Sequence, residues 1–174
     1  VLGKFPRQGG TLLDMARAFA QESQWKPEAG ATLNVLRWKR FVQAEGDAFM
    51  KMVDAFSKAM KVKVNISNES FDDIQPKASV AANTGTGPDL IWSLHSTPQL
   101  FPEKCLPMQD VADYLGKKYG GWFPAAEAYG KSGGKWVAIP VAVNGGYINY
   151  RISSINKAGF KEVPKDTAGF LELC

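Results

Sequence analysis

Aromatic, basic and hydroxyl side chains follow two short apolar runs in this sequence, residues 33–38 and 90–92. Aromatic rings provide faces on which the C–H surface of a sugar can stack, and Arg and His side chains donate hydrogen bonds to hydroxyl or acidic groups. We therefore treat both groups as candidate ligand-binding residues. They are Trp38, Lys39, Arg40 and Phe41 after the first run, and Trp92, Ser93, His95 and Ser96 after the second.

Other interpretations of these residues lead to different classes of protein. Trp92 could equally pack in the core, as tryptophans in strands often do. His95 is the only histidine, and neither a second spaced metal ligand nor a nucleophile elbow accompanies it, so we expect no catalytic residue, metal or cofactor. Residues 37–40 also resemble a site for single-stranded nucleic acid, but one such cluster in a chain of net charge +4 lacks a broad basic surface. We therefore expect no nucleic-acid partner.

Hydrophobic periodicity predicts the elements that position these candidates. The pattern indicates strands over residues 33–38, 62–66 and 90–92, and helices over residues 47–60 and from residue 71 onward. Alternating strands and helices are typical of a parallel sheet with right-handed crossovers, so the fold class is α/β. Because the carboxyl ends of parallel strands meet at one edge of the sheet, and ligands bind beyond that edge, both candidate groups should lie there.

The run from Ala81 to Trp92 joins the second of these helices to the third strand. Gly85 and Gly87 can adopt the positive φ that ends a helix, and Pro88 prevents the helix from continuing. Both glycines precede the strand, whereas a phosphate-binding loop has its glycines between a strand and a helix. The run is therefore interpreted as a turn.

Weaker patterns complete the expected elements. The segment Thr11–Asp14 resembles a capping box that opens a short amphipathic helix ending near residue 23. The middle of the chain mixes Pro, Gly and aromatic residues, which indicates short helices and loops over residues 98–131. The remaining expected elements are an extended segment over 135–143, a strand over 147–150 and a helix over 153–159.

The size and composition of the chain suit a globular domain. It has 174 residues, of which 45% are hydrophobic, enough for the core of one domain. No stretch approaches the roughly 18 apolar residues that span a bilayer, so we expect neither a membrane anchor nor a signal peptide in this chain. Cys105 and Cys174 are too few for a disulfide framework and are expected to be unpaired thiols. Val1 is not an initiator Met, and the helix predicted after Asp166 stops after about two turns, so we expect further sequence downstream.

Six segments occur in an order that is typical of one protein family. They are the helix with Lys77 and its Gly85–Asp89 end, Leu106–Asp110, Gly134–Pro140, Tyr150–Arg151, Lys157–Phe160 and Pro164–Thr167. With these segments the chain resembles the extracellular, or periplasmic, solute-binding proteins of ABC importers, family 1 type, the class that includes maltose-binding protein. The match covers residues 33–174, and the order is more specific than any single segment. Arg151 in place of Asn, and Ala168 in place of Trp, indicate a subgroup whose solute the sequence does not name.

The resemblance implies how the chain is organised. In that family two α/β lobes close on a solute, and residues 31–143 correspond to most of lobe one, after an N-terminal helix and linker over residues 1–30. Residues 144–174 correspond to the hinge crossing and the start of a truncated second lobe. Asn144 matches the crossing, where a polar side chain often faces the solute, although a plain turn is the alternative.

The resemblance also implies a function without catalysis. The protein would bind a small solute in a cleft between two lobes and deliver it to the membrane permease of an ABC importer, in the periplasm or outside the cell. A sugar or polyol is the expected solute, because aromatic residues flank the predicted cleft. The alternative is an α/β enzyme, a small-molecule transferase, whose catalytic half lies outside this chain. An incomplete fold would expose strand edges and apolar surface, so we also expect this fragment to self-associate.

Overall fold

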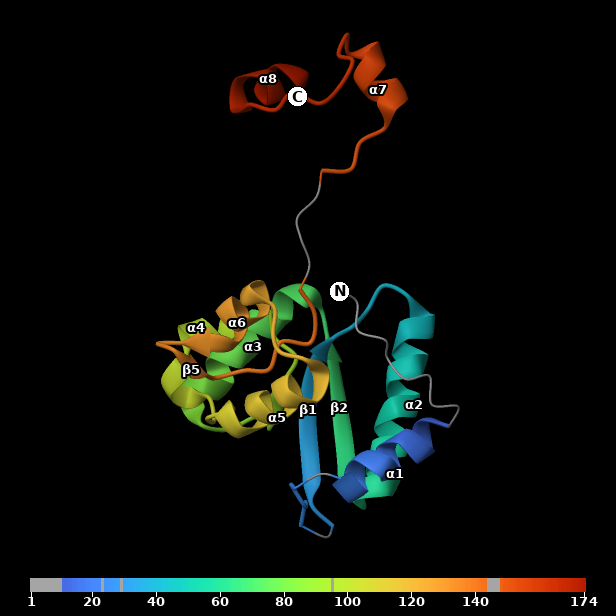
Figure 1. The fold of residues 1–174 in the computed structure, drawn as a ribbon, viewed down its shortest axis with the longest axis vertical. Coiled ribbons are helices and arrows are strands. Elements are labelled where there is room, and N and C mark those ends of the chain that lie inside the picture. Colours follow the sequence, from blue (N-terminus) through green and yellow to red (C-terminus); the bar gives the residue numbers. More distant parts are fainter. Residues whose placement is uncertain (1–10, 23, 29, 95, 144–147) are drawn as a thin grey trace. The chain divides into compact units, whose positions relative to one another are not determined.

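The computed structural model describes residues 11–22, 24–28, 30–94, 96–143 and 148–174. The chain divides into two compact units, Val1–Val141 and Ala142–Cys174. The first unit contains α1 (Leu12–Glu22), β1 (Thr32–Trp38), α2 (Gln43–Met60), β2 (Lys63–Glu69), α3 (Phe71–Thr84), β3 (Leu90–Ile91), α4 (Thr97–Leu100), the 3-10 helix η1 (Pro102–Lys104), α5 (Gln109–Tyr119), α6 (Pro124–Gly130), β4 (Lys131–Ser132) and β5 (Lys135–Trp136) (Figure 1). The second unit contains α7 (Ile152–Lys157) and α8 (Thr167–Leu173).

A parallel three-stranded sheet with the order β2-β1-β3 forms the centre of the first unit. β1 pairs with β2 over seven residues, from Thr32 opposite Lys63 to Trp38 opposite Glu69. β3 pairs with the other edge of β1 through Leu90 and the residue after it. Helices α2 and α3 connect the three strands in turn, and Figure 1 shows α2 on one side of the two long strands and α3 on the other. This arrangement confirms the predicted α/β fold class.

Successive residues of β1 contact different helices. Arg37 contacts Glu45 and Phe49 of α2, whereas Trp38 contacts Phe71 of α3. Because neighbouring side chains in a strand point to opposite faces, α2 and α3 cover opposite faces of the sheet. The buried apolar residues of this region come from β1, α2 and α3, and they are Val35, Leu36, Ala55, Ile74 and Ala78.

Both ends of α3 have local hydrogen bonds, and the glycine end is the one that the sequence predicts. The Ser70 hydroxyl accepts a hydrogen bond from the N–H of Asp73 at 3.2 Å and caps the first turn. At the other end Gly85 is left-handed, with φ of 68°, and its N–H donates to the carbonyl oxygen of Ala81 at 2.9 Å. Gly87 has φ of 137°, and a Cβ there would lie 3.1 Å from the Cβ of Ala81. The predicted turn before β3 is therefore confirmed.

The rest of the first unit packs around a buried tryptophan, Trp136. Its ring centroid lies 5.0 Å from that of Trp122, whose Nε1–H donates to the carbonyl oxygen of Ala112 at 3.0 Å. Gly130 is also buried, and a Cβ at this position would lie 2.3 Å from the Trp136 ring. The elements of this region are the short helices α4, η1, α5 and α6, which confirms the expectation for residues 98–131.

Two predicted extended segments differ from the structure. The segment 135–143 forms a strand only at Lys135–Trp136, which pairs antiparallel with β4. After that strand the N–H groups of residues 137 and 138 both donate to the carbonyl oxygen of Gly130. Because two successive N–H groups share one acceptor, the regular hydrogen bonding between β4 and β5 ends here. Residues 148–150 form no strand, and residue 147 lies outside the described residues. In the described part of the second unit there is no strand for this segment to pair with, and a single strand has no ladder to stabilise it.

The capping box at the start of α1 forms as predicted. The hydroxyl and the N–H of Thr11 donate to Oδ2 of Asp14 at 2.7 and 3.0 Å, and the N–H of Asp14 donates to Oγ1 of Thr11 at 3.2 Å. The bond from the Thr11 hydroxyl, followed by the bond from its N–H, lowers the pKa of Asp14. Helix α1 then packs against α2. Among the described helices, none combines the length and the apolar character that a membrane crossing requires.

The second unit has its own small set of contacts. Ile155 of α7 is buried, and Gly159 after this helix has φ of 86°. The carboxylate of Asp166 accepts a hydrogen bond from the N–H of Gly169 at 2.8 Å and caps α8. The helix predicted over residues 153–159 and the capped helix after Asp166 are therefore confirmed.

Candidate functional site

The carboxyl ends of β1 and β3 bring three candidate residues together. Cζ of Arg40 lies 3.8 Å from the ring centroid of Trp38 and 5.4 Å from that of Trp92. The N–H of Trp92 donates to the carbonyl oxygen of Leu36 at 2.8 Å, so β1 and β3 remain in register up to this residue. The parallel pairing therefore places the first predicted group and Trp92 at one edge of the sheet, which we call the carboxyl edge (residues 37–41 and 92).

A buried ion pair supports the carboxyl edge. Arg37 is 2% exposed, and its Nη2 donates to Oε1 and Oε2 of Glu45 at 2.9 and 2.8 Å. Its Cζ lies 3.8 Å from the ring centroid of Phe49 and 5.6 Å from that of Trp92. Aromatic faces attract cations, so the buried guanidinium has one carboxylate and two rings around it. These contacts compensate for much of the cost of removing its charge from water.

The same carboxylate also faces the second arginine. Nε of Arg40 lies 3.6 Å from Oε1 of Glu45, which is longer than a hydrogen bond. This Nε, like that of Arg37, is buried and has no hydrogen-bond partner within the described part of the chain. The Arg40 side chain as a whole is 28% exposed. One carboxylate thus neutralises Arg37 closely and Arg40 only weakly.

Exposed aromatic rings continue the surface beside Arg40. The ring of Trp38 makes edge contacts with Phe41 and Phe71, at centroid distances of 5.8 and 5.4 Å. Phe41 is 91% exposed and Phe71 is 46% exposed. Lys39 is exposed as well, and its N–H donates to the carbonyl oxygen of Glu69 at 2.7 Å. The carboxyl edge therefore offers aromatic faces next to basic groups.

The remaining candidates contribute less to this arrangement. The Ser93 hydroxyl donates to the carbonyl oxygen of Leu94 at 3.2 Å, and Ser96 is exposed before α4. Trp92 is half-buried, and its ring centroid lies 5.7 Å from that of Phe49, so it packs against α2 as well as facing Arg40. His95 and Asn144 lie outside the described residues.

Four residues of the carboxyl edge and its support are absent from the candidates that the sequence suggested. They are Arg37, Glu45, Phe49 and Phe71. Helix α2 begins at Gln43, whereas the sequence predicted a start at residue 47. The sequence gives no signal for the earlier start, because the N-cap residue Val42 has no side chain that can accept a capping hydrogen bond. The earlier start places Glu45 in the first turn of α2, facing Arg37. The sequence signal that could have revealed this contact is the pair of opposite charges, Arg37 and Glu45, on either side of a short strand-to-helix turn.

Two hollows are lined by residues outside the carboxyl edge. A groove of about 480 Å³ lies between the sheet and α3 and includes Asn34 and Ser67, with the Lys77–Glu69 ion pair, 2.6 Å long, in its wall. A second groove, of about 300 Å³, is apolar and includes Trp122. Neither is lined by the described candidate residues, so neither supports the predicted site.

The described residues show little that suits catalysis. Within this part of the chain there is no group of three or more His, Cys, Asp or Glu side chains placed to hold a metal ion. Burial, helped by the charge of Glu103, raises the pKa of the half-buried Cys105 thiol. A raised pKa lowers the fraction of reactive thiolate near neutral pH.

A family model described as bacterial extracellular solute-binding protein matches residues 51–174. The match includes most of the chain, and the chain belongs to this family. No curated protein sequence matches it.

Two solved structures show the same fold at low sequence identity. One is an ABC transporter solute-binding protein from Thermotoga lettingae TMO bound with α-D-tagatose, at a TM-score of 0.57 and 18% identity, covering 83% of this chain and 39% of that one. The other is the galacto-N-biose-/lacto-N-biose I-binding protein of the ABC transporter from Bifidobacterium longum in complex with lacto-N-biose, at a TM-score of 0.54 and 18% identity, covering 86% of this chain and 38% of that one. The chain thus spans less than half the length of these structures, and the fold corresponds to a partial lobe of such proteins.

Proposed function

We propose that this chain contributes one wall of a solute-binding cleft, and that the whole protein binds a sugar or polyol and delivers it to the permease of an ABC importer. The observation that carries the proposal is the carboxyl edge, where Arg40 stacks on Trp38 beside the exposed ring of Phe41. Aromatic faces and charged donors together are suited to a molecule with apolar C–H faces and polar oxygens.

The family membership and the two structures support this proposal from a different direction. Both similar structures are ABC transporter proteins that hold a sugar, and the family is bacterial and extracellular. We extend this to a location in the periplasm or outside the cell, to a role without catalysis, and to Lys39, Trp92, Ser93 and Ser96 as further wall residues. His95 and Asn144 remain proposed contacts, and residues 144–174 remain the proposed start of a second lobe.

A ligand panel tests the proposal on the protein in its natural length. A bound solute raises stability by RT ln(1 + [L]/Kd), about 2.7 kcal/mol at a hundredfold excess over Kd, so sugars and polyols can be compared by thermal shift. A panel in which no sugar or polyol raises the melting temperature would contradict the proposal.

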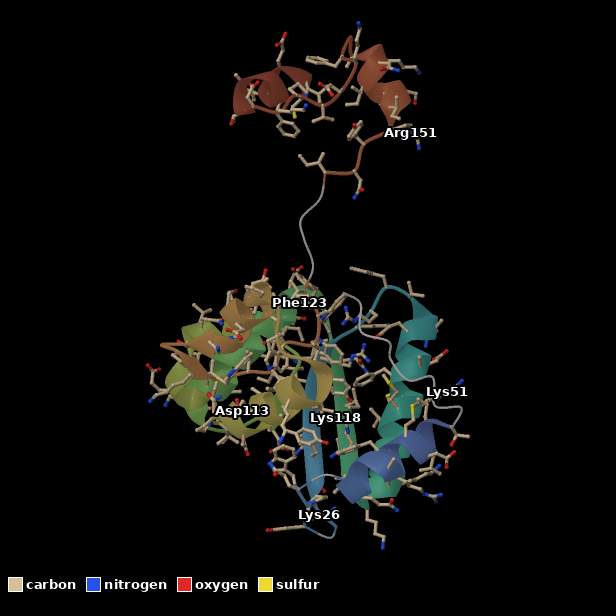
Figure 2. All side chains as sticks on the ribbon, in the orientation of Figure 1. Lys26, Lys51, Asp113, Lys118, Phe123 and Arg151 are labelled. Carbon is tan, nitrogen blue, oxygen red and sulfur yellow. The ribbon has the colours of Figure 1, made fainter. Side chains whose placement is uncertain are left out.

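The best ligand of the panel then tests the position of the site. Arg40→Ala should weaken binding by about 1 to 3 kcal/mol, the range for losing hydrogen bonds from a charged group, as measured by calorimetric titration. Lys51→Ala is the matched control, because Lys51 is exposed on the side of α2 away from the strands (Figure 2). Equal affinities of the two variants, with both folded, would remove Arg40 from the site.

A further inference from the structure

We infer that the solute carries a carboxylate and that Arg40 binds this group, so that the ligand is an acidic sugar rather than a neutral one. The inference rests on the proposed function, because it names the class of solute for the same site. It follows from the unequal way in which Glu45 is shared between two arginines.

The carboxyl edge has more positive than negative charge. Its basic residues are Arg37, Lys39 and Arg40. Among the described residues, Glu45 is the carboxylate that contacts the two arginines, at 2.8 Å from Arg37 and 3.6 Å from Arg40. Glu69 lies at the end of β2, but its carboxylate is 2.6 Å from the ammonium of Lys77 and already has a counterion. An anion at this edge would therefore reduce an excess of positive charge.

The excess lies on Lys39 and Arg40, and Arg40 is the one packed against the aromatic rings. Arg37 donates hydrogen bonds to both carboxylate oxygens of Glu45, and the burial of Arg37 keeps water from replacing these oxygens. Glu45 is consequently held by Arg37. Its Oε1 lies 3.6 Å from Nε of Arg40, so the Arg40 guanidinium has no hydrogen bond to Glu45. Lys39, which is exposed, and Arg40 are the two cations of this edge whose charge a ligand can still neutralise, and Arg40 is the one that lies against the rings of Trp38 and Trp92.

The packing of Arg40 also selects the shape of the group that it can bind. Its Cζ lies 3.8 Å from the centroid of Trp38, so one face of the guanidinium is covered by the ring. The side chain is 28% exposed and its Nε is buried, which leaves the terminal N–H groups as the donors that a ligand can reach. A planar pair of N–H donors fits the two oxygens of a carboxylate, whereas a sugar hydroxyl offers one oxygen.

The neighbouring rings provide the contact for the rest of such a ligand. Phe41 is 91% exposed and Phe71 is 46% exposed, and both contact the edge of Trp38. A sugar ring can stack its C–H face on an exposed aromatic while an attached carboxylate reaches the adjacent arginine. Tagatose and lacto-N-biose, the ligands of the two similar structures, have no carboxylate, so a ligand with one would distinguish this protein from them.

Matched pairs of acidic and neutral sugars test the inference. The protein in its natural length is titrated calorimetrically with glucuronate and glucose, and with galacturonate and galactose. For at least one pair the acid should bind about ten- to a hundredfold more tightly, as expected for hydrogen bonds to a charged group. Added salt should reduce this preference, because it screens a partly exposed ion pair.

Three variants connect the preference to Arg40. Arg40→Gln should remove most of the acid-to-neutral ratio, and Arg40→Lys should keep a part of it, since the charge remains without the planar pair of donors. Lys51→Gln removes one positive charge from the outer side of α2 and should leave the ratio unchanged. Thermal unfolding of each ligand-free variant verifies that it is folded.

The outcomes separate this inference from the proposed function. If a neutral sugar binds as tightly as its acid or more tightly, the acidic ligand is wrong while the sugar-binding function stands. If Lys51→Gln lowers the ratio as much as Arg40→Gln, the preference comes from overall charge and Arg40 is wrongly assigned. If no sugar of either kind binds to the folded protein, both the function and the inference fail.

Discussion

Replacing Glu45 by alanine should destabilise the chain more than replacing Arg37 by methionine. Glu45→Ala removes the hydrogen bonds of 2.9 and 2.8 Å from a guanidinium that is 2% exposed and leaves its charge buried without a counterion. Removing one member of a buried pair costs about 3 to 5 kcal/mol. The Glu45 side chain is 40% exposed, so solvent already screens the pair, and we expect a loss near 3 kcal/mol.

Arg37→Met has a smaller expected cost because it removes the buried charge itself. Methionine keeps an apolar contact with Phe49 and Trp92, whose ring centroids lie 3.8 and 5.6 Å from Cζ of the arginine. Glu45 is exposed enough to be hydrated, and it still faces Arg40. We expect a loss of about 1 kcal/mol, since apolar replacements of buried charges are often nearly neutral. The double variant should be more stable than Glu45→Ala alone.

Urea unfolding followed by tryptophan fluorescence measures these differences. Urea is uncharged and does not screen the ion pair as a salt denaturant would. Asp54→Ala is a control on the same helix, because its ion pair with Lys58 is exposed, and should change stability by less than about 0.5 kcal/mol. The reasoning is wrong if Arg37→Met costs as much as Glu45→Ala, or if the double variant loses the sum of the two.

Three further predictions concern other parts of the chain. Gly130→Ala should cost about 1 to 3 kcal/mol in thermal or urea unfolding, because the new Cβ would lie 2.3 Å from a carbon of the Trp136 indole. The control Gly46→Ala in α2, where the nearest atom is 4.0 Å away, should be neutral or stabilise by up to about 1 kcal/mol. A larger loss of stability in Gly46→Ala than in Gly130→Ala would contradict this packing. The lowered pKa of Asp14 means that the stability from its capping contacts is present above the ordinary carboxyl pKa and is lost as the pH falls through the lowered value. In an NMR titration, the Asp14 midpoint should move upward in Thr11→Ala. An unchanged midpoint would exclude the Thr11 hydroxyl as the cause of the lowered pKa. The 174-residue chain should self-associate in light scattering, including by exchange of its C-terminal segment, and bind solute more weakly than the protein in its natural length; a compact monomer with tight binding would refute this.

Local signals in the sequence were sufficient for much of the fold. The Gly85 turn, the capping box at Thr11 and the cap at Asp166 each depend on side chains within a few residues, and each forms as predicted. Strand and helix periodicity also placed β1, β2, β3 and α3 near their observed positions. Contacts between near neighbours can be inferred from one sequence, because few other partners compete for them.

Contacts between distant segments were the part that the sequence did not reveal. The segment 148–150 has the composition of a strand, but strand formation depends on a partner elsewhere in the chain. Phe49 and Phe71 lie in helices, and the rings that they contact come from β1 and from the residue after β3. Arg37 alternates like a residue of one strand face, and nothing in the pattern distinguishes a buried, paired arginine from an exposed one.

The pairing of Arg37 with Glu45 also bears on the order in which the candidate site forms. The two residues lie eight positions apart across one strand-to-helix turn, so their contact closes a short loop and loses little chain entropy. Trp92 reaches the same place only after β2, α3 and the turn before β3 have been traversed. The charged half of the carboxyl edge is thus a local structure and part of its aromatic half a long-range one, and we expect the charged half to form first.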